Sequence, residues 1–266
     1  MKDPAYYPSW KNWSKYGKYI AYFAEYIRYR DWKSLKAALR YVLFNKPTYA
    51  TWKAKSAMGY FFIRKGTTDF QFINYAYEKR VRNYLKDLVA SGKIDVFIDI
   101  GACIGEYDIW LARHGIYCIA FEPVNHEALR ENILLNQLEN RIKVYPFGLG
   151  SKQEKVSFKI MGTVTGSSRI DRYAKGGNIL IQRLDDMLPE LGIDFNSQFV
   201  MKLDVEGMET EVLDGARDFI ANAKHLKIIF EKYEHDDTVN NKLSALANFS
   251  FHKIDRYNYV ATKLCS

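Results

Sequence analysis

The segment Val96-Phe-Ile-Asp-Ile-Gly-Ala-Cys-Ile-Gly105 carries the clearest structural signal in the chain. A short apolar run closed by glycine is typical of a buried parallel strand. Gly101 and Gly105 allow the backbone to pass close beneath a ligand, and a helix that follows them would offer free N–H groups. Because Asp99 stands near the end of the strand, where open α/β sheets bind ligands, we expect a binding site here.

Apolar runs of the same kind recur downstream and alternate with helical patterns. Strands are predicted at residues 117–121, 143–145, 199–203 and 226–230, and helices at residues 107–113, 127–136 and 209–220. This alternation predicts an α/β, Rossmann-like fold, in which helices cover both faces of a mostly parallel twisted sheet. Segments 249–254 and 259–263 flank the turn signal Asp255-Arg-Tyr-Asn258 and predict a C-terminal antiparallel hairpin.

The first third of the chain is basic and aromatic. Residues 1–95 hold 19 Lys and Arg against 7 Asp and Glu, a net charge of +12, whereas the remaining residues sum to −4. Helical spacing predicts two amphipathic helices between residues 10 and 44, the second with the apolar positions Leu35, Leu39, Val42 and Leu43. Two interpretations stay open for their basic faces. Either these faces are solvated while the apolar faces pack against the core, or they are attracted to an anionic surface such as lipid headgroups, nucleic acid or acidic polysaccharide.

We expect three regions along the chain. Residues 1–47 form the helical N-terminal extension, residues 48–95 a helical lead-in with a helix over 73–88, and residues 96–266 the core. No apolar run approaches the roughly 20 residues of a membrane-spanning helix, and the start Met1-Lys-Asp-Pro lacks the apolar stretch of a signal peptide. Three cysteines without a CxxC pair argue against a disulfide framework or a structural zinc site. A cytoplasmic protein with reduced thiols is therefore expected.

A second acidic residue points to the kind of ligand. Glu122 follows Asp99 by 23 residues and ends the next predicted strand, where a carboxylate can accept hydrogen bonds from both ribose hydroxyls of a nucleoside. The glycine loop reads GxxxG rather than GxGxxG, and the chain has no GxxxxGK[ST] motif. We therefore expect no loop that binds a pyrophosphate closely. S-adenosylmethionine, an adenosine cofactor without phosphates, fits these features better than a nicotinamide dinucleotide does.

Several further motifs occur in a fixed order between residues 65 and 263. They are the loop from Asp99 to Gly105, Phe121-Glu-Pro123 followed by Leu129, Asn132 and Asn136, Arg183-Leu-Asp-Asp186, and Lys202-Leu-Asp-Val-Glu-Gly207 followed by Glu209 and Val212-Leu-Asp-Gly-Ala216. In these motifs the chain resembles the FkbM family of S-adenosylmethionine-dependent methyltransferases. Thr67-Thr-Asp69 and Tyr77-Glu78 resemble the family's upstream elements. One position departs from the family: Cys103 stands where the loop usually has Asn.

The resemblance implies a class I methyltransferase fold and transfer of a methyl group from S-adenosylmethionine to a hydroxyl oxygen. Residues expected to hold the cofactor are Asp99, Gly101, Ala102, Cys103, Gly105, Glu122 and Pro123, with Thr68, Asp69 and Glu78 from the upstream elements. Glu78 is the candidate for the cofactor's ammonium group. The family's acceptors imply a sugar or a natural product as substrate.

A methyl transfer to an alcohol needs a base, because an alcohol hardly ionises at neutral pH. Asp204 is the candidate, since it follows the strand 199–203 at the sheet edge expected to carry Asp99 and Glu122. Lys202, Glu206 and Glu231 share that edge, and His235 is a second choice of base. Two other interpretations stay open. In one, Asp204, Glu206 and Glu231 bind a divalent cation that acidifies the alcohol, and in the other, Lys202 and the carboxylates form a structural ion-pair network.

The acceptor that we favour is a sugar hydroxyl in a glycan, glycolipid or surface polysaccharide. A peripheral contact of residues 10–44 with an anionic membrane surface would suit such an acceptor. RNA methylation is an alternative because of the basic N-terminal third, but Lys202-Leu-Asp204 stands where base-amino methylation typically uses [ND]-P-P-[YF]. Nucleic acid is therefore not expected as a partner. A small natural-product hydroxyl and a non-catalytic binding module are the remaining alternatives.

Overall fold

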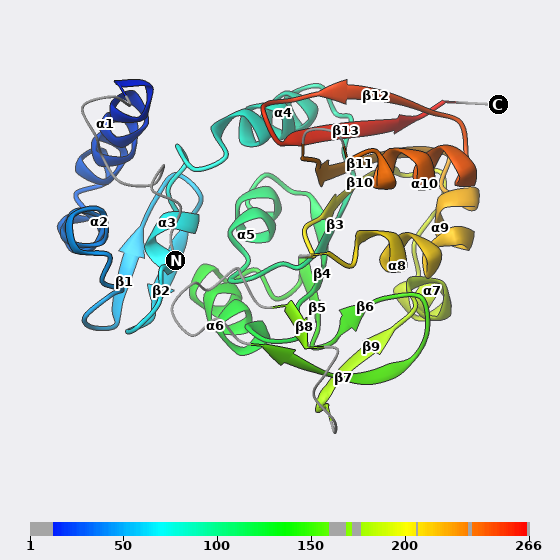
Figure 1. Cartoon of the computed structure of the whole chain (residues 1–266), viewed down its shortest axis with the longest axis horizontal. Coiled ribbons are helices and arrows are strands. Elements are labelled where there is room, and N and C mark those ends of the chain that lie inside the picture. Colours follow the sequence, from blue (N-terminus) through cyan, green and yellow to red (C-terminus); the bar gives the residue numbers. More distant parts are fainter. Residues whose placement is uncertain (1–12, 160–168, 172–176, 206, 234–235, 265–266) are drawn as a thin grey trace. The chain divides into compact units, whose positions relative to one another are not determined.

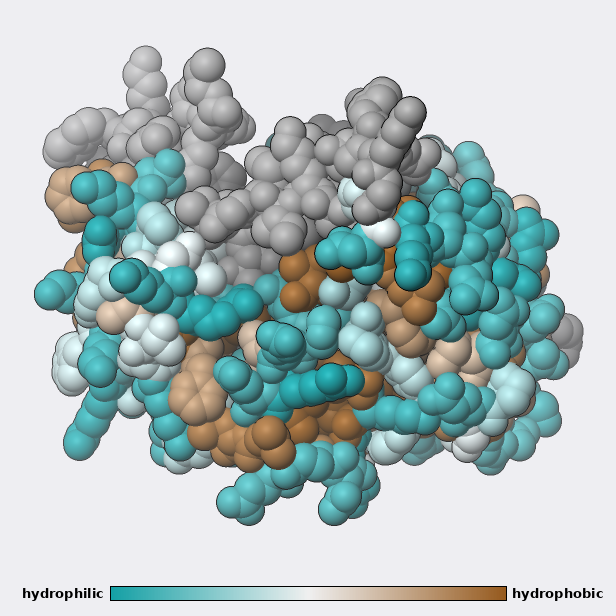
Figure 2. Space-filling view, turned by 90° about the horizontal axis from the view of Figure 1, so that it is seen from below, coloured by the Kyte–Doolittle hydropathy of each residue, from teal (hydrophilic) through white to brown (hydrophobic). Residues whose placement is uncertain are grey.

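The computed structural model describes residues 13–159, 169–171, 177–205, 207–233 and 236–264 (Figure 1). The described residues form two compact units, one within residues 13–79 and the other from residue 80 onward. Hydrophilic side chains cover much of the face shown in Figure 2, with apolar residues visible between them. None of the helices in these described ranges combines the length and the apolar character that crossing a membrane requires.

The first unit contains the two predicted N-terminal helices and a hairpin that the sequence patterns did not indicate. Its elements are α1 (Trp13–Arg28), α2 (Trp32–Phe44), the antiparallel strands β1 (Trp52–Lys55) and β2 (Tyr60–Ile63), and the short helix α3 (Asp69–Phe72). Helix α2 begins where a carboxylate oxygen of Asp31 accepts a hydrogen bond from the Ser34 backbone N–H, at 3.1 Å. It ends at Asn45, which has a left-handed backbone conformation, two residues before Pro47.

Helix α2 presents the opposite face to the one that its apolar pattern suggested. Leu39 and Leu43 are 40% and 64% exposed, whereas the buried side of the helix carries Ser34, Ala37 and Ala38. The hydroxyl of Ser34 accepts a hydrogen bond from the Trp52 indole N–H of β1, at 3.3 Å. The expectation that the leucine positions pack against a core is therefore wrong for Leu39 and Leu43. Ser34 and Tyr41, whose ring lies edge-on to that of Phe70 at 6.1 Å between centres, make contacts of the helix within its unit.

The second unit is built on a seven-stranded sheet with the order β12-β13-β11-β10-β3-β4-β5. Its strands are β3 (Val96–Ile100), β4 (Tyr117–Phe121), β5 (Ile142–Tyr145), β10 (Gln198–Leu203), β11 (His225–Glu231), β12 (Phe249–Lys253) and β13 (Asn258–Lys263). Neighbouring strands from β5 to β11 are parallel, and β13 runs antiparallel to both β11 and β12. The predicted α/β fold with a C-terminal antiparallel hairpin is confirmed.

The alternation of side chains along β3 divides the unit into two packed layers. Val96, Ile98 and Ile100 join the hydrophobic core that the sheet forms with one set of helices, and Phe97 lies against Tyr107 on the other face. The helices of that core are α7 (Leu184–Leu191), α8 (Glu209–Asp214), α9 (Arg217–Asn222) and α10 (Thr238–Leu246). Helices α5 (Glu106–Ala112) and α6 (His126–Asn136) cover the opposite face (Figure 1), and α4 (Lys79–Ala90) precedes β3. Asp99 alternates with the core residues and so points away from α7–α10.

A second, smaller sheet follows β5 and was not predicted. It has the order β6-β9-β7-β8, with β6 (Gly148–Leu149), β7 (Glu154–Lys159), β8 (Arg169–Asp171) and β9 (Ile179–Gln182). Only Leu149 and Ile181 are fully buried hydrophobic residues among those described in these strands. Strands this short that bury so few apolar residues carry a weak sequence signal.

Two predicted helices are interrupted in the structure. The pattern over 73–88 becomes helical only from Lys79, because the Asn74 side chain accepts a hydrogen bond from the Ala76 backbone N–H at 3.0 Å and so stabilises a turn. The predicted helix 209–220 breaks at Gly215, whose carbonyl accepts the Asp185 backbone N–H at 2.9 Å. A Cβ at Gly215 would lie 1.9 Å from the Gly150 carbonyl oxygen, so the chain passes there without a side chain.

The motif Arg183-Leu-Asp-Asp186 has a structural role at this break. The buried carboxylate of Asp185 accepts a hydrogen bond from the Phe219 backbone N–H of α9, at 3.0 Å, and one from the Arg183 guanidinium, at 3.1 Å. Asp186 is exposed and contacts the same guanidinium at 3.3 Å. One aspartate therefore joins α7 to α9, and its neighbour makes only a surface ion pair.

We expect Asp185→Ala to lower the free energy of unfolding by about 1–3 kcal/mol, because it leaves the buried Phe219 N–H without an acceptor. Asp186→Ala should change it by less than about 0.5 kcal/mol, the usual effect of a surface ion pair. Urea denaturation of both variants measures the difference as a shift of the midpoint at constant slope. Equal shifts for the two variants would contradict this role of Asp185.

Candidate active site

The candidate site lies at the carboxyl ends of β3, β4 and β10. The strand order reverses between β3 and β10, because the chain proceeds from β3 to β4 on one side and from β10 to β11 on the other. Open α/β sheets bind ligands at such a switch point. Asp99 and Lys202 are register partners across it, and the Asp204 backbone N–H donates to the Ile100 carbonyl at 3.0 Å. The structure thus joins two of the predicted motifs at one edge.

The glycine loop needs both of its glycines for steric reasons. Gly101 has φ +93°, and a Cβ there would lie 2.0 Å from the carbonyl oxygen of Asp204. Gly105 has φ +80°, and its Cβ would lie 2.0 Å from Cδ1 of Leu129. Side chains are excluded at both positions, so the loop passes directly beside the chain segment that carries Asp204.

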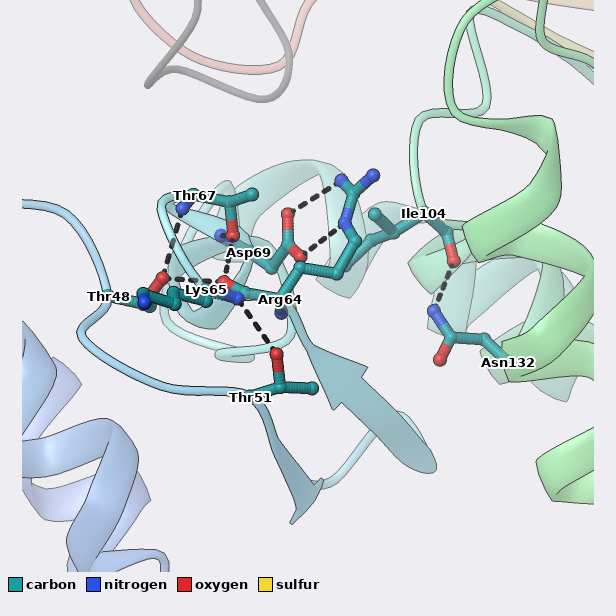
Figure 3. A network of polar contacts seen from close by, with 8 residues as sticks. All are labelled: Thr48, Thr51, Arg64, Lys65, Thr67, Asp69, Ile104 and Asn132. Atoms are coloured by element: carbon teal, nitrogen blue, oxygen red, sulfur yellow. Dashed lines mark hydrogen bonds and ion pairs between the residues drawn. The ribbon is translucent and has the colours of Figure 1, made fainter.

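Helix α6 supports this loop from the other side. The buried side-chain amide of Asn132 donates to the Ile104 carbonyl at 3.0 Å (Figure 3). The Asn136 amide in turn donates to the Asn132 carbonyl, at 2.7 Å. Leu129 and Asn132 therefore hold the loop in position, and Asn136 bonds to the backbone of Asn132.

Glu122 organises the loop through backbone N–H groups. Its Oε1 accepts hydrogen bonds from Val124 and Asn125, at 2.7 and 2.8 Å, and its Oε2 accepts one from Cys103, at 2.8 Å. Burial raises the pKa of Glu122, and the three N–H groups act in the opposite direction. A carboxylate oxygen has two lone pairs, so Oε2 retains an acceptor position for a ribose hydroxyl. The acceptor position left on Glu122 and the glycine backbone of the loop fit a nucleoside.

Cys103 contributes its backbone to this arrangement. Its φ is +52°, a left-handed conformation that Asn adopts more readily than most other residues that carry a side chain. In this chain the Cys103 N–H still reaches Glu122, so the departure from the family leaves the connection between the loop and the carboxylate intact.

A cluster of buried charges lies behind the loop, and sequence reasoning missed most of it. Its members are Arg82, Asp99, Glu106, Asp108 and Lys202, all buried. Burial raises the pKa of Asp99 to about 7 and that of Glu106 to about 8, although Lys202 lowers both and Arg82 lowers that of Glu106. The missed signal was the presence of two carboxylates, Glu106 and Asp108, in the first turn after Gly105.

Asp99 and Asp108 form a pair of interacting carboxyl groups. No N–H or O–H donor in the described ranges reaches Oδ1 of Asp99 or either carboxyl oxygen of Asp108. Burial, together with the nearby Asp99 charge, raises the pKa of Asp108 well above its usual value.

Lys202 connects this cluster to the predicted base. Its ammonium lies 2.5 Å from Oδ2 of Asp204 and 5.1 Å from the centre of the Tyr107 ring. The Lys202 side chain is only 8% exposed, whereas that of Asp204 is 40% exposed. Asp204 thus combines an ion pair to a buried cation with access to solvent.

Of the remaining predicted catalytic residues, the structure describes Glu231. Glu231 ends β11 directly after Phe230, the register partner of Leu203 on β10, and is half-buried. Glu206 and His235 lie outside the described residues. Within the described ranges, no group of three or more His, Cys, Asp or Glu side chains is arranged to hold a metal ion. Since Glu206 lies outside those ranges, the cation site of Asp204, Glu206 and Glu231 stays a prediction.

Three predicted cofactor residues belong to the first unit. The buried Asp69 is held there by Arg64, whose Nε and Nη2 contact the two carboxylate oxygens at 2.8 and 3.0 Å (Figure 3). Thr68 is buried, and Glu78 is half-buried with φ +48°. Asp69 has a structural role within its own unit. Cofactor binding by these three residues stays a prediction.

The fold and the site define a class I, S-adenosylmethionine-dependent methyltransferase. The model of the methyltransferase FkbM domain matches residues 99–259, more than half of the chain. The chain therefore belongs to the FkbM methyltransferase family, as its motifs indicated. No curated protein matches the chain.

Solved structures of methyltransferases resemble the chain in fold. A SAM-dependent methyltransferase from Agrobacterium tumefaciens has 9% sequence identity and a TM-score of 0.46, with 80% of this chain and 70% of that chain covered. Magnesium protoporphyrin IX methyltransferase from Synechocystis PCC 6803, with bound SAM, has 12% identity and a TM-score of 0.44, with coverages of 74% and 83%. The N-terminal domain of human METTL16 in complex with SAH has 15% identity and a TM-score of 0.41, with coverages of 73% and 70%.

We expect the buried carboxyl cluster to make stability fall as pH rises from about 4 to 8, because the raised pKa values of Asp99 and Glu106 let the folded state bind more protons than the unfolded state there. Asp108→Asn keeps a donor beside Asp99 and removes one ionisable group. The variant should melt about 3 °C or more above wild type at pH 8 and close to it at pH 5. Thermal melts across this range, with the exposed Asp87→Asn as control, test this. Parallel curves for wild type and Asp108→Asn would contradict it.

Gly101→Ala should abolish cofactor binding or unfold the loop, because the new methyl group would collide with the Asp204 carbonyl. Gly115 is a matched control, since it has φ +90° but no atom within 4 Å of the position that a Cβ would take. Gly115→Ala should cost only the strain of a left-handed alanine, about 1–2 kcal/mol. Titration with S-adenosylhomocysteine and thermal melts compare the two. Equal behaviour would show that backbone strain alone explains Gly101.

Proposed function

We propose that this methyltransferase transfers a methyl group to a hydroxyl oxygen. The hydroxyl belongs to a sugar in a glycan, glycolipid or surface polysaccharide. The ion pair of Lys202 and Asp204 beside the glycine loop is the observation that supports an oxygen acceptor. A half-exposed carboxylate at this edge suits the removal of a proton from a neutral alcohol. Family membership and the carboxylates at the sheet edge also argue against a non-catalytic binding module.

The residues of the loop would orient the cofactor. S-adenosylmethionine, when bound, supplies a methyl group on a positively charged sulfur. Gly101 and Gly105 let the loop pack against the Asp204 carbonyl and Leu129, and Oε2 of Glu122 retains an acceptor position for a ribose hydroxyl. Much of the rate gain of such a transfer comes from alignment of the reacting atoms, which a rigid binding loop provides.

Asp204 would act as the base. Lys202 holds Oδ2 at 2.5 Å, which orients the carboxylate and leaves Oδ1 to accept the hydroxyl proton. The nearby Tyr107 ring and the buried position of Lys202 restrain the ammonium, so the carboxylate keeps one orientation. Lys202 would be a positioning residue in this arrangement, and Asp204 the catalytic one.

The acceptor is tested by incubation of the protein with labelled S-adenosylmethionine and separate panels of sugars, RNA and small phenols or alcohols. A sugar acceptor predicts label transfer to a glycan that is lost when one hydroxyl is replaced by hydrogen. Transfer to RNA or to a small natural product alone would replace the glycan proposal with that alternative. Cofactor binding with no transfer to any sugar would also count against it.

Asp204→Asn should lower kcat by about 100-fold or more, the usual contribution of a general base, with S-adenosylhomocysteine affinity within about threefold of wild type. Asp218→Asn, an exposed change of the same kind on α9, should leave both quantities unchanged. The assay combines initial rates with calorimetric titration of the cofactor product. Wild-type turnover in Asp204→Asn would remove the base assignment and leave the methyltransferase family intact.

A further inference from the structure

The solvent-facing side of α2 carries large apolar residues that are exposed and are not part of a hydrophobic core. Trp32, Leu39 and Leu43 follow one another at helical spacing on this side, and Phe44 continues it at the end of the helix. Trp32 is 59% exposed and Phe44 66% exposed, with Leu39 and Leu43 exposed as described above. Four large apolar side chains on a helix of 13 residues are thus exposed, and exposed apolar patches commonly mark interaction sites.

Basic residues border this apolar surface. Lys33 and Lys36 are exposed and Arg40 is half-buried, and α2 contains no Asp or Glu. The Lys36 ammonium and the Arg40 guanidinium each lie 5.7 Å from the centre of the Tyr49 ring. A shallow groove on this surface is lined by Lys36, Leu39, Arg40, Leu43, Phe44 and Tyr49. The apolar and cationic groups therefore share one surface, which we call the α2 face.

We propose that the α2 face binds the interface of an anionic lipid bilayer, with the helix parallel to the membrane plane. Leucine and phenylalanine side chains would enter the boundary of the acyl chains, and tryptophan would lie at the level of the headgroups. The lysines and Arg40 would remain beside lipid phosphates, where each cation strengthens binding. At about 1.5 Å per residue, α2 offers a contact about 20 Å long.

Charge and apolarity together favour a membrane over other occupants. A second copy of the chain would bring two basic N-terminal regions together, since residues 1–95 carry a net charge of +12. Nucleic acid would satisfy the cations but leave Trp32, Leu39, Leu43 and Phe44 in water. A bilayer with anionic headgroups satisfies both kinds of side chain at once. This inference is independent of the acceptor proposed above.

Co-sedimentation of the full chain with lipid vesicles tests the inference. Wild type should bind phosphatidylcholine vesicles that contain about 30 mol% phosphatidylglycerol at least about tenfold more strongly than pure phosphatidylcholine. Leu39→Glu with Leu43→Glu should abolish binding, because the helix then presents carboxylates to the acyl region. Lys36→Glu should weaken binding about fivefold or more, and added salt should weaken it further.

Matched changes on the second unit serve as controls. Leu134→Glu alters a leucine that is 60% exposed on α6, and Lys86→Glu alters an exposed lysine on α4. Both should bind vesicles as wild type does. All variants change exposed residues, and thermal melts report their folding. As a second measurement on folded wild type, brominated acyl chains should quench tryptophan fluorescence, and Trp32→Phe should remove most of that quenching.

Several results would overturn the inference. They are equal binding of wild type to neutral and anionic vesicles, unchanged binding of the double glutamate variant, and quenching that persists in Trp32→Phe. Loss of a dimer or of RNA binding in the double variant, with vesicle binding unchanged, would assign the α2 face to that partner instead.

Discussion

The close approach of Gly101 to the carbonyl of Asp204 is the constraint on which the site depends. It brings the loop after β3 beside the chain segment after β10, at the point where the strand order reverses. The two segments approach this closely only because residue 101 lacks a side chain. The parallel pairing of Asp99 with Lys202 keeps them in register. The cofactor loop and the proposed base are therefore parts of one rigid junction.

Behind this junction the protein buries more charge than a purely structural sheet edge needs. Burial raises the pKa values of Asp99, Glu106 and Asp108, whereas the buried Lys202 lowers those of Asp99 and Glu106 and the buried Arg82 lowers that of Glu106. Clusters of carboxyl groups with raised pKa values concentrate at functional sites, because low dielectric surroundings strengthen every charge near a reacting group. The cost in stability is consistent with a role in cofactor binding.

Some features could be predicted because the signal is local. The strand Val96–Ile100 and the C-terminal hairpin each depend on neighbours in the sequence, and both are confirmed. Others depend on distant partners. Gly215 breaks a periodic helical pattern because another segment of backbone passes beside it, and Arg82 joins the site from a helix that precedes the sheet. The periodicity of apolar residues along the sequence carries no information about such contacts between distant segments.

The sequence alone determined the alternating strands and helices of the seven-stranded sheet and the family, because these follow from patterns within short segments. Only the tertiary structure decided that burial raises the pKa values of Asp99 and Asp108, that Glu122 is engaged by three backbone N–H groups, and that Leu39 and Leu43 of α2 face solvent. Burial and charge pairing arise between elements, and helical spacing identifies an apolar stripe without telling which partner it meets.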